Sequence, residues 1–145
     1  MLPFDLLKDE ECFRAVKSKI LVIDDNRNIR KLLVLHLRQT SYDAIEAATS
    51  LEALKQARAI RPDLILMDLA MPDGIEAIAT LKADPLTQHI PIIVGTAFLH
   101  GELLDAAIAA GAAEILRKPL NLNWLDLVLQ RHLSCQPEMH LMPKN

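Results

Sequence analysis

Asp63-Leu64-Ile65-Leu66-Met67-Asp68 is the stretch of sequence that decides the fold. Its apolar residues form a short continuous run between Pro62 and Pro72, a pattern typical of a central parallel strand covered by helices on both faces. The run ends in a single carboxylate, Asp68. Because open α/β sheets bind ligands beyond the carboxyl ends of their strands, the side chains that reach this edge bear most directly on function.

The composition is that of one domain built on an aliphatic core. The chain has 145 residues, of which 51% are apolar but only 3% aromatic, so we expect a core of Leu, Ile, Val and Ala. No apolar run approaches the roughly 20 residues needed to span a bilayer, and the acidic N-terminus does not fit a secretory signal. We therefore expect a cytoplasmic protein with no membrane insertion.

Charge and cysteine content bear on two further classes of protein. The net charge is −3 and the two signs are mixed along the chain, which argues against nucleic-acid binding. Cys12 and Cys135 lie near the two ends. Free thiols in a reducing compartment are the simplest interpretation, and a disulfide that joins the two tails is the alternative.

Strand and helix patterns alternate five times between residues 19 and 133. This alternation implies right-handed βαβ units, so we predict a doubly wound α/β fold with a five-stranded parallel sheet. Residues 1–18 are an N-terminal extension, either a short helix or a partly ordered arm, and 134–145 form a tail. The predicted strands are 20–23, 42–47, 64–68, 90–94 and 113–116, and the predicted helices are 28–39, 49–60, 73–83, 99–110 and 121–133.

Short polar residues mark the ends of the predicted helices. Gly111 follows the fourth helix and is a natural left-handed C-cap. The predicted N-caps are Asn26, Thr49 (with Glu52 at capping-box spacing), Asp73 (with Glu76 at the same spacing) and either Asn121 or Asn123.

Side chains capable of chemistry follow four of the five predicted strands. Asp24 and Asp25 follow the first strand, and Asp68 ends the third. Thr96 follows the fourth strand and Lys118 follows the fifth. Because the carboxyl ends of parallel strands share one edge, we expect three carboxylates, a hydroxyl and an ammonium group in one cleft.

Three converging carboxylates are more than helix capping requires, although capping by itself would explain Asp24 or Asp25 taken singly. Two unit charges about 4 Å apart repel by roughly 4 kcal/mol at an effective dielectric near 20. Either a proton is retained or a cation is bound, and oxygen ligands without His or Cys suit Mg²⁺. A carboxylate beside Mg²⁺ and Lys118 is a plausible nucleophile toward phosphorus.

At this point the chain resembles a known family, the receiver domain of two-component response regulators (CheY-like). The resemblance covers about residues 19–133 and implies the flavodoxin-like strand order 2-1-3-4-5. It also implies a phosphoprotein of a two-component or phosphorelay system that signals, rather than an enzyme acting on a separate substrate. The motifs that carry the resemblance, in this order and each at a strand end, are Asp24-Asp25, Asp68, Thr96-Ala97 and Lys118-Pro119.

The resemblance also implies a role for each matching residue. Asp68 would accept a phosphoryl group from a histidine kinase or a phosphotransfer protein and hold it as an aspartyl phosphate. Lys118 would contact that group, and Thr96 would move to bond it. The implied Mg²⁺ ligands are Asp24, Asp25, Asp68 and the carbonyl of Ala70, and the amides of Ala70 and Ala97 would help to cradle the phosphoryl group.

The sequence departs from the family pattern at three places. Met71-Pro72 runs directly into Asp73-Gly74, so the loop after the phosphoacceptor is two residues shorter than usual. Ile115 stands where the family usually has an aromatic residue that changes rotamer with the threonine. Gly95 precedes Thr96, where a larger apolar residue is common. Ile115 and the short loop put the switching of conformation in question.

Only about a dozen residues follow Leu133, so we expect the output to be contact with a downstream target protein. Leu125 and Leu129 are predicted to pack on the sheet, which would turn other apolar residues of the last helix outward. The alternative is that residues 1–18 or the tail cover this surface. The predicted surface for a target or a homodimer lies on the fourth helix, fifth strand and fifth helix and comprises Leu104, Ile115, Trp124, Leu127 and Val128.

Two functional hypotheses from different classes follow. In the first, the protein is a single-domain response regulator whose partner contact depends on phosphorylation of Asp68. In the second, it is a receiver-like scaffold that binds its partner regardless of phosphate. A flavodoxin-like or phosphatase-like enzyme would need a flavin loop or a second general acid, and the sequence offers neither.

Overall fold

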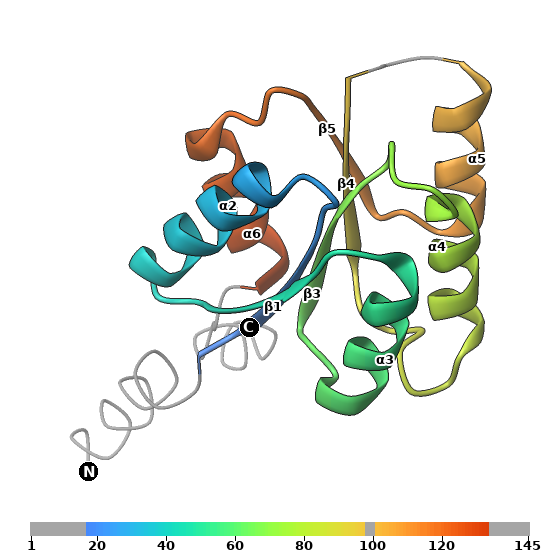
Figure 1. Cartoon of the computed structure of the whole chain (residues 1–145), viewed down its shortest axis with the longest axis horizontal. Helices are drawn as coiled ribbons and strands as arrows, with labels where there is room; N and C mark the ends of the chain where they lie inside the picture. Colours follow the sequence, from blue (N-terminus) through green and yellow to red (C-terminus); the bar gives the residue numbers. More distant parts are fainter. Residues whose placement is uncertain (1–16, 98–100, 134–145) are drawn as a thin grey trace, which may run out of the picture.

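The computed structural model describes residues 17–97 and 101–133, and shows a parallel five-stranded sheet in the order β2-β1-β3-β4-β5 (Figure 1). This is the predicted doubly wound topology, and it is confirmed. Residue pairs such as Val22 with Leu66 and Met67 with Val94 fix the register of the central strands. The strands are β1 (Lys19–Ile23), β2 (Asp43–Ala47), β3 (Leu64–Asp68), β4 (Ile92–Thr96) and β5 (Glu114–Arg117).

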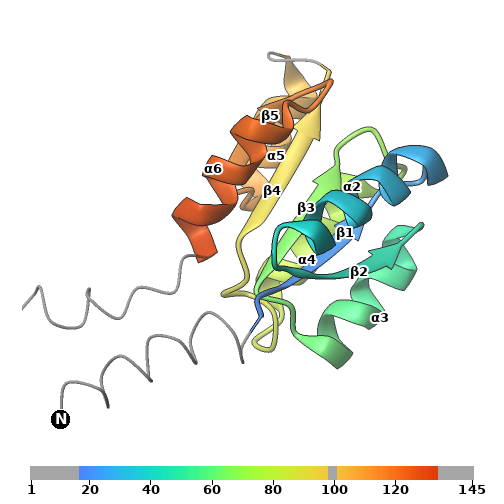
Figure 2. The same ribbon diagram turned by 90° about the vertical axis from the view of Figure 1, so that its left-hand side faces the viewer.

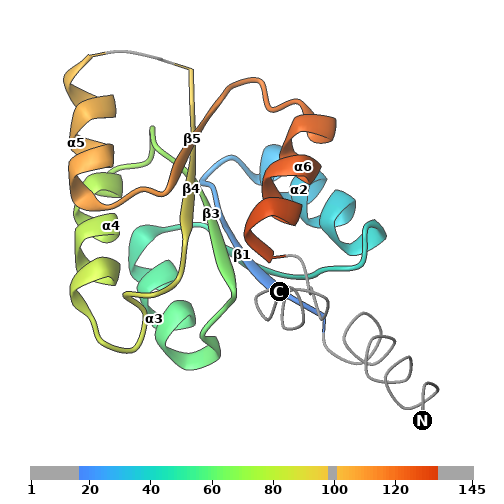
Figure 3. The same cartoon turned by 180° about the vertical axis from the view of Figure 1, so that it is seen from behind.

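Helices cover both faces of this sheet and make a three-layer α/β/α arrangement. Helices α2 and α6 lie on one face, and α3, α4 and α5 lie on the other (Figures 2 and 3). The helices are α2 (Arg27–Gln39), α3 (Ser50–Ile60), α4 (Gly74–Ala83), α5 (Glu102–Ala110) and α6 (Leu122–Leu133).

Two apolar cores, one on each face of the sheet, hold these layers together. Alternate residues of each strand enter opposite cores, since successive side chains of a strand point to opposite faces. In β1, Ile20 and Val22 pack toward α2 and α6, whereas Leu21 and Ile23 pack toward α3, α4 and α5. All five residues of β3 are buried, as the continuous apolar run predicts for a central parallel strand.

Local signals placed most helix ends correctly. The Asn26 side chain accepts a hydrogen bond from the Ile29 amide at 3.0 Å, which confirms this N-cap. The Glu52 amide donates to Thr49 Oγ1 at 3.1 Å, Asn121 rather than Asn123 caps α6, and Gly111 ends α5 with φ of 119°. Asp73 is the exception: it precedes α4 with φ of 60° and makes no side-chain cap hydrogen bond.

The structure corrects the bounds of two elements by two residues or more. Strand β4 begins and ends two residues later than the predicted 90–94: Gly95 pairs with both β3 and β5, and Thr96 pairs with β5. Helix α5 begins at Glu102, three residues later than predicted. Position 101 is its N-cap, a glycine with φ of 111°.

The predicted arm, tail and cysteines lie almost entirely outside the described residues. Residues 17 and 18 precede β1, and the amide of Asp43 donates to the Ser18 carbonyl at 2.9 Å. Within the described part of the chain, none of the helices combines the length and the apolar character that crossing a bilayer requires.

Candidate functional site

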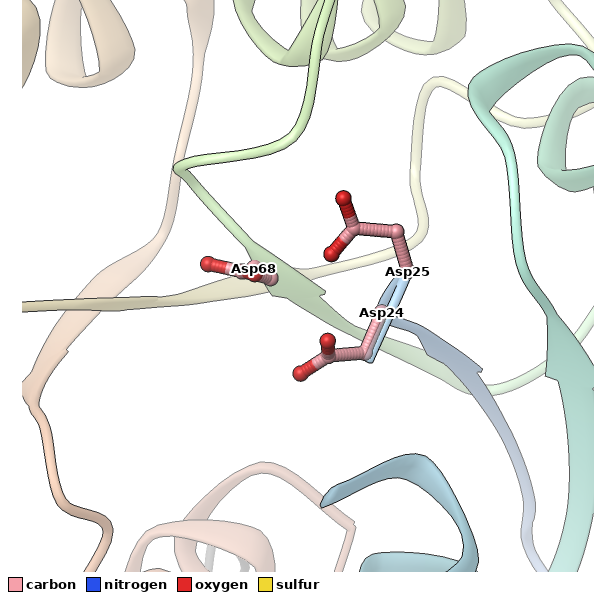
Figure 4. Close-up of side chains that lie close together, drawn as sticks. All are labelled: Asp24, Asp25 and Asp68. Atoms are coloured by element: carbon pink, nitrogen blue, oxygen red, sulfur yellow. The ribbon is translucent and has the colours of Figure 1, made fainter. Parts of the chain in front are cut away.

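Three carboxylates meet at the carboxyl edge of the sheet. One oxygen of each of Asp24, Asp25 and Asp68 lies within 4.8 Å of the others. Figure 4 shows the three side chains arriving from the ends of β1 and β3. Asp24 and Asp68 are only 3% and 8% exposed, whereas Asp25 faces solvent. The site therefore has two fixed acids beneath one that solvent can reach.

The turn after β1 positions Asp24. The backbone amide of Asn26 donates to Asp24 Oδ1 at 2.8 Å, and the Asp24 amide donates to the Ala47 carbonyl of β2 at 3.2 Å. The Asp24 carbonyl accepts from Arg30 Nη1 at 2.8 Å. Backbone and side chain of Asp24 are thus both fixed.

Asp68 occupies the last position of β3, where the chain turns sharply. The Ala70 amide donates to Asp68 Oδ1 at 3.0 Å, and the Leu69 amide donates to the Gly95 carbonyl of β4 at 3.0 Å. The first bond fixes the carboxylate and the second keeps its strand paired to the very end. Ala70 itself is exposed, so its backbone lies at the open rim.

Lys118 brings the positive charge that the sequence predicted. Its ammonium nitrogen lies 2.8 Å from Asp68 Oδ1 and 3.9 Å from Asp24 Oδ2. Gly95 gives it room, because a Cβ at that position would lie 3.4 Å from Cε of Lys118. The Lys118 amide donates to the Thr96 carbonyl at 2.8 Å, and the peptide bond to Pro119 is cis.

Thr96 and Ala97 complete the rim. Thr96 is the last residue of β4 and is only 3% exposed. Ala97 follows it and is exposed. The residue before them, Gly95, pairs with Asp68 of β3, and Thr96 pairs with Arg117 of β5.

Burial raises the pKa of Asp24 above its usual value. Removal of the carboxylate from water is the largest cause, and the negative charges of Asp68 and Asp25 act in the same direction. The hydrogen bond from the Asn26 amide and the charge of Lys118 oppose the shift. A neighbouring cation would stabilise the ionised form of this buried carboxylate. Lys118 alone faces three acids, so the site has a deficit of positive charge.

The oxygen donors fit a hard divalent cation. The cluster contains three carboxylates and no His or Cys, the donor chemistry that favours Mg²⁺ over transition metals. Asp24 and Asp68 are already held by backbone amides, so the donors are oriented before any ion arrives.

The predicted interaction surface is only partly exposed. Trp124 and Leu127 are 50% and 56% exposed, and Leu104 and Ile115 are half-buried. Val128 was predicted to face outward, and this is wrong: it is fully buried in the core on the α2 and α6 side of the sheet. Its i+3 spacing from Leu125 puts it on the inward face of α6.

Sequence reasoning missed Arg30 and Glu46. Arg30 Nε lies 2.8 Å from Glu46 Oε1, and the same side chain reaches the Asp24 carbonyl. The two residues are 16 positions apart on a helix and an edge strand, and no periodic pattern links them. The sequence therefore gives no signal that these two side chains meet.

Residues 20–130 match the family model described as Response regulator receiver domain, and this match decides the family. The chain belongs to the response regulator receiver family. The match covers every strand of the described sheet except the first residue of β1, and it includes the whole acid cluster.

Curated relatives share this domain in proteins of different lengths. The chain is 30% identical over 120 residues to sporulation initiation phosphotransferase F of Bacillus subtilis, covering 81% of this chain and 95% of that protein. It is 32% identical over 121 residues to the regulatory protein AtoC of Escherichia coli, covering 82% of this chain. The chain spans only 26% of AtoC, and 55% of the transcriptional regulator PdtaR of Mycobacterium tuberculosis.

Solved receiver structures have the same fold. The chemotaxis protein CheY4 of Vibrio cholerae matches with a TM-score of 0.76 and 32% identity, over 81% of this chain and 100% of that one. The receiver domain of sensor histidine kinase PA1611 from Pseudomonas aeruginosa matches with a TM-score of 0.77 and 29% identity, over 83% of this chain and 100% of that one. That structure has a magnesium ion coordinated in its active-site cleft.

Proposed function

We propose that this receiver accepts a phosphoryl group on Asp68 in a reaction that depends on Mg²⁺. The observation that carries the proposal is the placement of Lys118, whose ammonium nitrogen lies 2.8 Å from Asp68 Oδ1 beside two further carboxylates. A lysine paired to one acid of a three-acid cluster supports phosphoryl transfer, because it can neutralise phosphoryl oxygens while the acids hold a cation.

In the proposed reaction a carboxylate oxygen of Asp68 attacks the phosphorus of a phosphohistidine. An O–P bond forms and the P–N bond breaks; the electron pair stays on the imidazole nitrogen of the donor. A histidine kinase or a phosphotransfer protein would supply that group. The result is an aspartyl phosphate on Asp68.

Each residue of the site has a role in this proposal. Asp24, Asp25, Asp68 and the Ala70 carbonyl would hold Mg²⁺, which when bound neutralises charge on the phosphoryl oxygens. Lys118 and the Thr96 hydroxyl would contact the phosphoryl group. The Ala70 amide already donates to the Asp68 carboxylate at 3.0 Å, and it would cradle the group together with the Ala97 amide.

We propose that the signal leaves through contact with another protein, in the cytoplasm and without nucleic acid. The supporting observation is a group of exposed apolar side chains on α5 and α6: Leu103, Ile108, Trp124 and Leu127 are each between 43% and 56% exposed. Together with the half-buried Leu104 and Ile115 they form a surface that suits a target protein or a second copy of the chain.

A scaffold that binds its partner regardless of phosphate is the second candidate. Ile115 favours it, because this aliphatic side chain packs against the core on the α3, α4 and α5 side and has no aromatic ring to bury or expose. An aromatic rotamer change coupled to Thr96 is therefore absent at this strand position.

Beryllofluoride, a stable mimic of a phosphoryl group, separates the two candidates. With Mg²⁺, amide NMR signals of the wild-type chain should shift both around Asp68 and along α5, β5 and α6 if the site switches that surface. Shifts confined to the site would favour the scaffold, and Asp68→Asn is the control that should show neither. Trp124→Ala should weaken self-association or partner binding under both candidates, and an unchanged affinity would exclude this surface.

A further inference from the structure

Arg30 ties the metal side of the site to the edge strand. It lies in the first turn of α2, and its side chain is only 13% exposed. Nη1 donates to the Asp24 carbonyl at 2.8 Å, and Nε donates to Glu46 Oε1 of β2 at 2.8 Å. The planar guanidinium presents donors in fixed directions, so one side chain satisfies both acceptors at once.

These bonds close a ring around the backbone of Asp24. The Asp24 amide donates to the carbonyl of Ala47, the neighbour of Glu46 in β2. The Asp24 carbonyl is held by Arg30, which Glu46 holds in turn. Both backbone polar groups of this buried acid are therefore anchored to β2, directly on one side and through Arg30 on the other.

Glu46 is kept ionised, as its hydrogen bonds to two cations require. Its pKa is lowered first by the hydrogen bond from Lys31 and then by that from Arg30. Lys31 Nζ lies 2.9 Å from Glu46 Oε2. Glu46 therefore accepts from both cations through separate oxygens, which leaves the guanidinium fork aimed at Asp24.

We infer that Arg30 is a positioning residue for cation binding: it fixes the backbone of Asp24 and so the carboxylate that faces Asp68. The inference rests on the proposed Mg²⁺ site and goes beyond it, because Arg30 holds the backbone carbonyl of Asp24 and is not one of the proposed ligands. Partners that orient metal ligands typically change metal affinity by about 10-fold to 100-fold when removed.

Arg38 provides a matched control on the same helix. Its Nη2 donates to the backbone carbonyl of Ala44 at 3.0 Å, so it too joins α2 to β2 through a carbonyl. Ala44 lies near the amino end of β2, at the opposite edge of the sheet from the acids. Arg38→Met and Arg30→Met each remove one guanidinium that bridges the same two elements.

The test is a Mg²⁺ titration of the full chain, followed through the amide NMR signals of Asn26 and Ala70. Arg30→Met should raise the dissociation constant by about tenfold or more, and Arg38→Met should leave it within about twofold of wild type. Thermal unfolding of both variants shows whether they remain folded. Glu46→Gln is a second test. It removes the negative charge that holds the Arg30 guanidinium while Arg30 itself remains, and should give a Mg²⁺ affinity between those of wild type and Arg30→Met.

The outcomes are separable. Wild-type affinity in Arg30→Met, or an equal loss in Arg38→Met, would overturn the positioning role and leave the proposed function standing. Should Arg30→Met fail to fold, wild-type affinity in Glu46→Gln would overturn it. A wild-type chain that binds no Mg²⁺ would overturn the metal site and this inference together.

Discussion

The corner after β1 and the corner after β3 each carry an acid to the same edge of the sheet, but they are held differently. At the first corner, Asp24 is fixed by β2, by the Arg30 side chain and by the Asn26 amide. At the second corner, Asp68 is followed by a turn that bonds mainly to itself. The Met71 amide donates to the Asp68 carbonyl at 3.3 Å, and the Gly74 amide donates to the Met71 carbonyl at 3.1 Å.

The second corner also lacks a helix cap of the usual kind. Asp73 precedes α4 in the left-handed region, and its side chain caps nothing, whereas Asn26 caps α2. Ser50 Oγ, which donates to the Pro72 carbonyl at 3.1 Å, ties the shortened loop to α3. The comparison teaches that Asp24 is anchored to the edge strand β2 by backbone and side-chain hydrogen bonds, whereas Asp68 is held by its own turn, by pairing with β4 and by Lys118.

The largest expected effect comes from substitution of Asp24. Asp24→Asn keeps an oxygen that can accept from the Asn26 amide but removes one negative charge from the cation site. We expect Mg²⁺ affinity to fall by at least about tenfold, because ligand charge sets the affinity of such sites. Calorimetric titration measures this change. An unchanged affinity would remove Asp24 from the proposed ligands.

The same variant should be more stable than wild type without metal. Because the folded-state pKa of Asp24 is raised, the favourable contribution of Asp24 to the free energy of unfolding is fully present below its usual pKa of 3.8. That contribution is lost as the pH rises through the folded-state pKa. Relief of this charge should therefore raise the free energy of unfolding at neutral pH. Urea unfolding at several pH values should show the two proteins converging toward acid, and a constant difference would contradict the assignment.

Removing the cap at the first corner should cost stability. Asn26→Ala takes away the oxygen that accepts from the Ile29 amide, and loss of such a cap typically destabilises by about 1 kcal/mol. Asn28→Ala, on the exposed surface of the same turn, is the control and should change stability by no more than about 0.5 kcal/mol. Equal effects of the two substitutions would show that the cap does not stabilise the corner.

The equivalent position at the second corner should respond in the opposite direction. Asp73→Gly removes a side chain that makes no cap hydrogen bond and relieves a φ of 60°, which should stabilise by roughly 0.5 kcal/mol. Asp73→Ala, which keeps a Cβ in the left-handed region, should not stabilise. Loss of stability in Asp73→Gly would mean that the aspartate supports the loop in some other way.

The fold and the acid cluster were predictable from the sequence because both follow from local patterns. Continuous apolar runs identify buried parallel strands, and the topology of such a sheet places their carboxyl ends at one edge. The sequence therefore predicts that Asp24, Asp25 and Asp68 meet and that Lys118 pairs with Asp68, and the structure shows both.

What the sequence did not predict depends on tertiary contacts. Gly95 has little preference for strands, yet it stays in β4 because it is paired on both sides. Val128 was misplaced because only Leu125 and Leu129 were assigned to the inward face, although a packed helix buries a wider stripe. The Arg30–Glu46 pair joins elements whose spacing carries no periodic signal.

The most direct test of the central claim is the intact mass of the protein after incubation with acetyl phosphate, with and without Mg²⁺. We predict a gain of one phosphoryl group that requires Mg²⁺ and is absent in Asp68→Asn. A gain that persists in Asp68→Asn would contradict the assignment of the phosphoacceptor. No gain, together with no binding of beryllofluoride, would contradict phosphoryl transfer and leave a receiver-shaped docking module.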